Sequence, residues 1–142
     1  MKKILAYILP AICAFLLISC DKEQKLYEGP AQIAFENTAK TYTIAATTTS
    51  VEIPIQLIAD GAQGAITANI AVNSTTNCAS AVTVPASVTI DAGKFSSKLV
   101  INVNHSALAA GTNVNKLVLD LTASGIKVSQ NYNKVTLTLN KQ

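Results

Sequence analysis

The sequence predicts an all-β protein whose mature part is a single antiparallel β-sandwich of about seven to nine strands. Three observations carry this prediction. From residue 31 onward, apolar residues alternate with polar ones at a period of two. Such runs recur at spacings of roughly 8 to 18 residues, separated by residues that favour turns. The sequence has no helical spacing of comparable length, so two packed sheets are the architecture that can bury these apolar faces.

Five runs show the clearest alternation, and each is expected to be a strand with one face on the core and one in water. They cover residues 51–57, 66–72, 99–103, 117–121 and 135–139. Shorter strands are expected at residues 32–36, 41–45, 81–84 and 87–90. Pro54 lies inside the first long run. Because proline has no N–H to give to a ladder, it predicts an edge position or a bulge there.

Short polar or glycine-containing segments connect these strands. Turn compositions are found at residues 47–50, at Asp60-Gly61 and at Ala92-Gly93. The best helical candidate is a single turn at residues 106–110, with Ser106 as its N-cap and Gly111 as its stop. One domain is expected at residues 31–142, an immunoglobulin-like sandwich, with a closed barrel as the alternative. A single sandwich of this size would carry any binding site on a loop or a sheet face.

Residues 1–19 differ from the rest of the chain. They carry two lysines directly after Met1, continue with an apolar run at residues 4–18, and end on the small residue Ser19. These three parts predict a secretory signal peptide. A transmembrane helix is the alternative, but the run holds about 15 residues, is interrupted by Pro10, and falls short of the roughly 20 that a bilayer core requires.

The end of this leader, Leu17-Ile18-Ser19-Cys20, resembles the lipobox of bacterial lipoproteins. The resemblance implies cleavage between Ser19 and Cys20 and a diacylglyceryl thioether on the Cys20 thiol, so that Cys20 becomes the first residue of the mature protein. Because one acyl chain holds a protein at a membrane only marginally and two or three hold it stably, the expected product is anchored to the membrane without spanning it. An ordinary signal peptide with an incidental cysteine is the alternative.

A short charged segment, Asp21-Lys22-Glu23-Gln24-Lys25, follows the cysteine. Together with Gly29-Pro30 it predicts a lipidated flexible tether at residues 20–30. The segment resembles the acidic and lysine-bearing export signal of Bacteroidetes lipoproteins, which implies the outer membrane and its extracellular face. In enteric bacteria, an aspartate directly after the lipidated cysteine would instead imply retention at the inner membrane.

A family resemblance extends into the domain. Residues 84–103 read as a strand, a short turn with the letters Ala92-Gly93-Lys94, and a second strand of alternating apolar residues. Residues 115–122 fit a following strand and residues 33–36 an opening strand. This pattern resembles Calx-beta-like domains and Bacteroidetes outer-membrane lipoproteins with no assigned activity, some of which accompany glycan-utilisation systems and are thought to bind or present polysaccharide. The resemblance therefore implies an immunoglobulin-like sandwich and a role in glycan capture at the cell surface.

Metal and cofactor sites are not expected. Calx-beta domains of the calcium-binding kind use clustered acids, whereas Asp60, Asp91 and Asp120 stand singly in this sequence. One histidine and one unpaired mature cysteine do not make a zinc site, and six glycines leave little room for a phosphate-binding loop. Cys78 has no cysteine partner once Cys20 carries lipid, so a buried or half-buried, unreactive thiol is expected.

Nucleic-acid binding and catalysis are not expected either. After residue 19, nine lysines face eight acidic residues without a cluster, so the chain lacks the cationic stripe that a phosphate backbone requires. His105, Ser106 and Asp120 are the residue types of a hydrolase triad. Adjacent residues on an extended chain point to opposite sides, however, so His105 and Ser106 are not expected to share a proton. The sequence therefore predicts a protein that is not an enzyme.

A binding module remains the main functional expectation. Carbohydrate sites present exposed aromatic rings beside amides and carboxylates, and this chain has no tryptophan. With Phe35 and Phe95 expected in the core, Tyr42 and Tyr132 are the candidate ligand-binding residues, although a tyrosine in such a position is more often a half-buried strand residue. Asparagine and threonine side chains could form hydrogen bonds with sugar hydroxyls, or they could simply form the solvent-exposed face of a sheet. A glycan-capture accessory is thus the first class of function. An adhesion or assembly module for another protein, or a structural spacer without a ligand, is the alternative.

Overall fold

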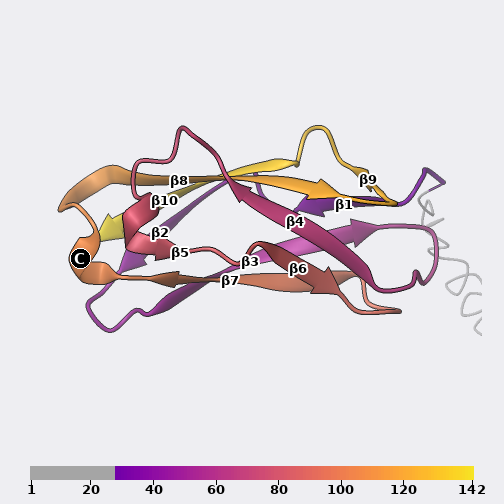
Figure 1. The fold of residues 1–142 in the computed structure, drawn as a ribbon, viewed down its shortest axis with the longest axis horizontal. Coiled ribbons are helices and arrows are strands. Elements are labelled where there is room, and N and C mark those ends of the chain that lie inside the picture. Colours follow the sequence, from indigo (N-terminus) through magenta and orange to yellow (C-terminus); the bar gives the residue numbers. More distant parts are fainter. Residues whose placement is uncertain (1–27) are drawn as a thin grey trace, which may run out of the picture.

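A computed structural model of the chain describes residues 28–142, which form two β-sheets packed face to face (Figure 1). The strands are β1 (Gln32–Phe35), β2 (Ala39–Ile44), β3 (Ser50–Ile58), β4 (Ile66–Val72), β5 (Val82–Thr83), β6 (Ser87–Ile90), β7 (Ser96–Val103), β8 (Gly111–Ala123), β9 (Lys127–Val128) and β10 (Lys134–Lys141). Two 3₁₀ turns, η1 (Ala79–Ala81) and η2 (His105–Ala107), lie in the connections. The expected all-β sandwich is confirmed. Ten strands form within the described residues, and the two-residue β9 is the one that no sequence run predicts.

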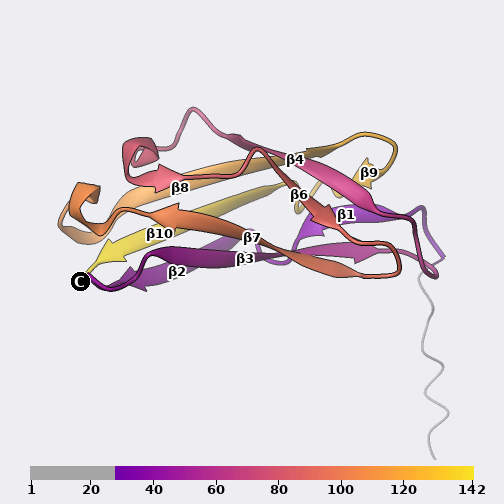
Figure 2. The same ribbon diagram turned by 60° about the horizontal axis from the view of Figure 1, so that its bottom comes forward.

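Each sheet contains five strands. The first has the order β5-β7-β3-β1-β9 and the second the order β2-β10-β8-β4-β6. Figure 2 shows β10 between β2 and β8 in the second sheet. Most neighbouring strands are antiparallel, as predicted, but β1 with β9 and β2 with β10 are parallel pairs. The wholly antiparallel expectation is corrected here for a simple reason. The N-terminal segment is divided between the sheets: it leaves the first sheet after β1 and joins the second, as β2, beside the C-terminal strand.

The alternation along the strands builds the core as the sequence predicts. Buried residues alternate with exposed or half-buried ones along β3, β7 and most of β10. Removal of these apolar faces from water is the main force that holds the two sheets together. The largest fully buried side chains come from both sheets: Ile33, Phe35, Ile44, Ile55, Ile90, Leu99, Ile101, Leu117, Leu119, Val135, Leu137 and Leu139.

Phe95 is the exception, because it was expected in the core and is instead 46% exposed. It lies in the short connection between β6 and β7, where its carbonyl accepts from the Leu57 N–H (2.8 Å). At this end of the sheet, no second layer covers the ring completely. A phenylalanine beside an alternating run is therefore not buried merely because it is apolar.

Pro54 lies inside the first sheet, which corrects the expectation of an edge position or a bulge. Its strand, β3, pairs in regular register with β7 on one side and β1 on the other. The reason is the place where β1 ends. Phe35 pairs with Ile55, and beyond it the Glu36 N–H donates to the Pro54 carbonyl (3.2 Å). The missing N–H of Pro54 thus faces the point where the neighbouring strand turns away, so the ladder loses little.

The helical turn expected at residues 106–110 is also corrected. The 3₁₀ turn η2 begins at His105, and Asn104 caps it in place of Ser106: the Asn104 carboxamide oxygen accepts from the Ser106 N–H (3.2 Å) and hydroxyl (2.7 Å). Gly111 begins β8 instead of ending a helix, with φ at 126°. The positive φ reserves this position for glycine, and a Cβ there would also lie 2.8 Å from Val114 Cγ2, so that the exposed Val114 side chain would have to shift.

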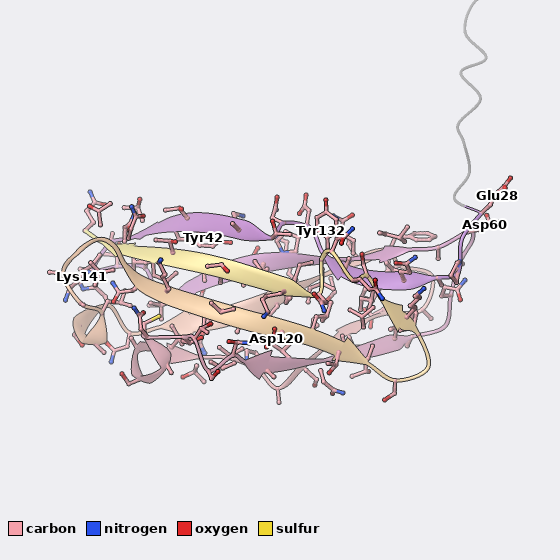
Figure 3. All side chains as sticks on the ribbon, turned by 90° about the horizontal axis from the view of Figure 1, so that it is seen from above. Glu28, Tyr42, Asp60, Asp120, Tyr132 and Lys141 are labelled. Atoms are coloured by element: carbon pink, nitrogen blue, oxygen red, sulfur yellow. The ribbon has the colours of Figure 1, made fainter. Side chains whose placement is uncertain are left out.

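The long axis of the sandwich separates the two ends of the described chain. Glu28 and Asp60 lie at one end, and Lys141 lies at the other (Figure 3). The signal peptide, the Ser19 and Cys20 cleavage position and most of the tether predicted at residues 20–30 lie outside the described residues. Within residues 28–142, no helix has the length and apolar character needed to cross a membrane.

Candidate functional site

A shallow hollow of about 270 Å³ lies on the outer face of the first sheet, where β1 and β3 run side by side. Six residues line it: Ala34, Phe35, Glu36, Gln56, Ile58 and Tyr132. The β3 members alternate with the core residues of that strand, so their side chains point outward. Tyr132 lies on the side of the sandwich, away from both ends (Figure 3).

Tyr132 is held at the hollow by its own backbone. It lies in the connection between β9 and β10, where its N–H donates to the Ser129 carbonyl (3.2 Å) and its carbonyl accepts from the Phe35 N–H (2.9 Å). Phe35 is fully buried, whereas Tyr132 is 43% exposed. The ring therefore remains accessible while a core strand fixes its attachment point. Such preorganisation reduces the conformational entropy that is lost when a ligand binds.

Two polar residues, Glu36 and Gln56, line the hollow together with Tyr132. Glu36 is exposed, and its N–H bond to the Pro54 carbonyl keeps it beside β3 after β1 has ended. Gln56 is half-buried and pairs directly with Ala34 across the two strands. The strand register thus places an aromatic ring, a carboxylate and a carboxamide around one hollow.

These three groups have complementary binding chemistry. An aromatic ring covers apolar C–H surface, an ionised carboxylate accepts hydrogen bonds, and a carboxamide both donates and accepts them. A molecule with an apolar face and several hydroxyl groups matches all three. The sequence pattern singles out Tyr132 alone, because Glu36 and Gln56 lie at unremarkable positions, one at the end of a short strand and one on the polar side of a long strand.

Tyr42 lies apart from the hollow. Its ring packs against the core from β2, and its hydroxyl donates to the Glu52 carbonyl on β3 in the other sheet (2.5 Å). The Lys40 ammonium lies 4.9 Å from the centre of the ring. The structure therefore gives Tyr42 a contact that joins the two sheets, and it does not bring Tyr42 and Tyr132 into one site.

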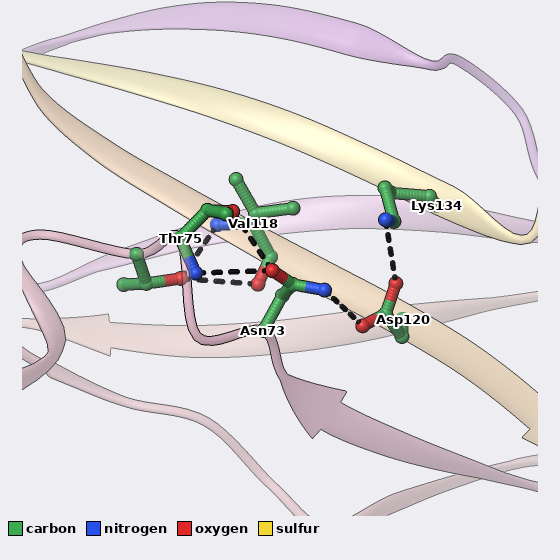
Figure 4. Close-up of polar contacts among 6 residues, drawn as sticks. Asn73, Thr75, Val118, Asp120 and Lys134 are labelled. Atoms are coloured by element: carbon green, nitrogen blue, oxygen red, sulfur yellow. Dashed lines mark hydrogen bonds and ion pairs between the residues drawn. The ribbon is translucent and has the colours of Figure 1, made fainter.

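His105, Ser106 and Asp120 do not assemble into a triad. His105 Nε2 lies 2.9 Å from the main-chain oxygen of Gln142, and the Ser106 hydroxyl donates to Asn104. Asp120 instead accepts from the Asn73 carboxamide (2.6 Å) and lies 3.6 Å from the Lys134 ammonium (Figure 4).

The polar cluster around Asp120 fixes a loop. The Asn73 carboxamide oxygen accepts from the Thr75 N–H (3.0 Å) and hydroxyl (2.8 Å), while the Thr76 hydroxyl bonds to both the N–H and the carbonyl of Val118 (Figure 4). These side chains continue the pairing of β4 with β8 after β4 has ended. The cluster satisfies its own polar groups, and its evident role is to hold this loop along β8.

The described residues contain no metal centre and one thiol. Among residues 28–142, no group of three or more histidine, cysteine, aspartate or glutamate side chains is placed to hold a metal ion. Cys78 is a free cysteine that is 4% exposed, as the sequence predicts. Burial raises the pKa of the Cys78 thiol above its usual value, which keeps the thiol protonated at neutral pH.

No known protein-family model and no curated protein matches the sequence, but solved structures match the fold. A candidate carbohydrate-binding protein from Bacteroides ovatus aligns with a TM-score of 0.60 and 15% identity, over 78% of this chain and 37% of that protein. A second Bacteroides ovatus protein, of unknown function, aligns with a TM-score of 0.59 and 16% identity, over 76% of this chain and 46% of that one. The apo form of the Calx CBD1 domain aligns with a TM-score of 0.56 and 13% identity, over 79% of this chain and 99% of that domain.

At these identities the likeness shows the fold alone. The domain is a Calx-beta-like sandwich, which the resemblance in the sequence implies and the alignments support. The chain spans less than half of the two Bacteroides proteins and almost the whole Calx domain.

Proposed function

We propose that this protein is a lipid-anchored lipoprotein on the outer face of the outer membrane, and that it captures polysaccharide without catalysing its cleavage. The observation that carries the binding function is the hollow that Tyr132, Glu36 and Gln56 line together. A pyranose ring has an apolar C–H face and an edge of hydroxyl groups. The tyrosine ring suits the first, and the carboxylate and carboxamide suit the second.

The shape and position of the hollow support an extended ligand over a small enclosed one. The hollow is shallow and lies on the side of the sandwich, whereas Glu28 lies at one end (Figure 3). A tether that joins the domain at that end leaves the side face open. The Bacteroides ovatus neighbour described as a candidate carbohydrate-binding protein adds weak support from the same fold.

Replacement of Tyr132 with alanine is expected to weaken polysaccharide binding by about tenfold, because the uncovered sugar face loses roughly 1.5 kcal/mol of apolar contact. The measurement is affinity electrophoresis of the detergent-solubilised full chain through gels that contain a panel of polysaccharides. Tyr132→Phe keeps the ring and should retain most of the binding. Phe95→Ala removes a ring of similar exposure from outside the hollow and should leave binding unchanged. Equal binding by wild type and Tyr132→Ala would show that the hollow is not the site.

Replacement of Cys20 with serine is expected to abolish lipid attachment and processing, so that the chain stays at precursor size and incorporates no fatty acid, because no thiol remains to carry the diacylglyceryl group. The readouts are the size of the chain and incorporation of labelled fatty acid. Cys13→Ser alters a cysteine within the leader and should be processed normally. Protease added to intact cells then tests the outer face: resistance of the anchored wild type would contradict surface exposure. Normal processing of Cys20→Ser would contradict the lipid anchor.

A further inference from the structure

We propose that the hollow selects sugar units that donate hydrogen bonds and carry no negative charge, that is neutral or amino-bearing sugars, and that it rejects uronates and sulfated sugars. This inference rests on the proposed polysaccharide binding at the same site. It follows from the identity and surroundings of the single charged side chain that lines the hollow, Glu36.

Glu36 offers acceptors only. An ionised carboxylate has two oxygens with several lone pairs and no proton to donate, so its partners must be hydroxyl, amine or ammonium groups. Hydrogen bonds to an ionised acceptor are roughly twice as strong as neutral ones. Two adjacent hydroxyls of a neutral sugar could each donate to one oxygen of Glu36. A uronate unit keeps its ring hydroxyls, but the carboxylate at C6 is itself acceptor-only and cannot donate to Glu36 as a C6 hydroxyl can.

No cation in the lining offsets this charge. Lysines are absent from the six residues that line the hollow. On the same face of the sheet, Lys98 pairs with Pro54, which is the residue that Glu36 contacts through the main chain. The Lys98 ammonium forms an ion pair with Glu52, however, at 2.6 Å from a carboxylate oxygen, so its charge is already balanced by Glu52. The hydrogen bond and the charge of Glu52 raise the pKa of Lys98, so the ammonium that faces Glu52 keeps its charge at neutral pH.

An acidic ligand therefore meets Glu36 without a counter-charge in the lining. Two like charges about 4 Å apart in water repel strongly enough to weaken binding by about fivefold. Where the C6 hydroxyl of the neutral sugar donates to Glu36, the loss of that one hydrogen bond on oxidation adds to this factor. Because the site is open to solvent, added salt should reduce the repulsive part.

The test compares each neutral polysaccharide that the wild type binds with the same polymer oxidised at C6 to the carboxylate. The wild-type full chain is expected to bind the neutral form at least fivefold more tightly. In Glu36→Gln, the neutral form should bind more weakly, the oxidised form should bind more tightly, and the ratio should approach one. Glu28→Gln makes the same change in net charge at the end of the sandwich and should keep the wild-type ratio.

The outcomes separate the two proposals. If the wild type binds polysaccharide but prefers the oxidised form, or if Glu36→Gln keeps the wild-type ratio, charge selection by Glu36 is wrong while polysaccharide capture stands. If the wild type retains neither form of any polymer, both proposals are wrong.

Discussion

Replacement of Phe35 with alanine is expected to lower the free energy of unfolding by about 3 to 5 kcal/mol. Phe35 is 1% exposed and is the largest of the fully buried side chains. The variant loses the free energy that burial of the phenyl ring contributes. It also leaves a cavity between the two sheets, because their paired strands cannot move far enough to fill it. Urea unfolding followed by circular dichroism measures the change.

The matched control is Phe95→Ala, in which the same chemical group is removed from a position that is 46% exposed. Its expected cost is below about 1 kcal/mol, since little buried surface is lost. A similar loss of stability in the two variants would mean that burial does not determine the effect. Phe35→Leu refills most of the cavity and should cost much less than Phe35→Ala.

Replacement of Asn115 with alanine is expected to lower the free energy of unfolding by about 2 to 4 kcal/mol, a large effect for a polar residue. Asn115 is 3% exposed and is the buried polar side chain of the described core. Its carboxamide accepts from the Ala109 N–H (2.9 Å) and donates to the carbonyls of Ala109 (2.9 Å) and Leu139 (3.0 Å). Truncation leaves these main-chain groups unpaired, and a buried unpaired group costs more than the hydrogen bond contributed.

Two further variants test whether the loss of stability in Asn115→Ala comes from the unpaired main-chain groups. Asn69→Ala removes an exposed asparagine from β4 of the same sheet and should change stability by less than about 0.5 kcal/mol. Asn115→Asp keeps the size of the side chain and the acceptor for Ala109 N–H, but an ionised carboxylate cannot donate to the two carbonyls. It should be at least as destabilising as Asn115→Ala. If Asn115→Ala is no more harmful than Asn69→Ala, water must replace all three bonds and the argument fails.

Much of the fold was predictable because apolar residues at every second position indicate which face of a strand is buried. The runs at residues 66–72 and 87–90 coincide with β4 and β6, and the other long runs lie inside strands that extend a few residues further. Alternation does not state which strands become neighbours. The transfer of the chain from β1 to β2, and the parallel pairs that result, depend on contacts between residues that are far apart in sequence.

The candidate site was less predictable than the fold for the same reason. Tyr132 could be named because exposed aromatic residues are few in this chain. Glu36 and Gln56 carry no local signal, and they become a site only when the register sets Ala34 opposite Gln56 and the Phe35 N–H binds the Tyr132 carbonyl. The composition indicates which residue types could bind a sugar. Which of these residues lie together depends on the pairing between strands.

Local rules failed where a neighbouring element overrode them. Pro54 was expected at an edge, where no neighbouring strand needs an N–H from it. The end of β1 creates the same situation inside the sheet. Ser106 is a good N-cap by residue type, but Asn104 precedes it and takes the capping position, which moves the turn to His105. In both cases the residue type was interpreted correctly, and the position was decided by the residue beside it.

The parallel pair of β2 and β10 also constrains the order in which the domain can fold. Ala39 lies opposite Thr136 and Ile44 opposite Lys141, so the first strand of the second sheet pairs with the last strand of the chain. Contacts of such high sequence separation require closure of a very long loop, which slows folding. The second sheet therefore has no complete edge until the last strand has been synthesised. Refolding of the described domain is therefore expected to be slow, because its second sheet is complete only after strands from opposite ends of the described residues have paired.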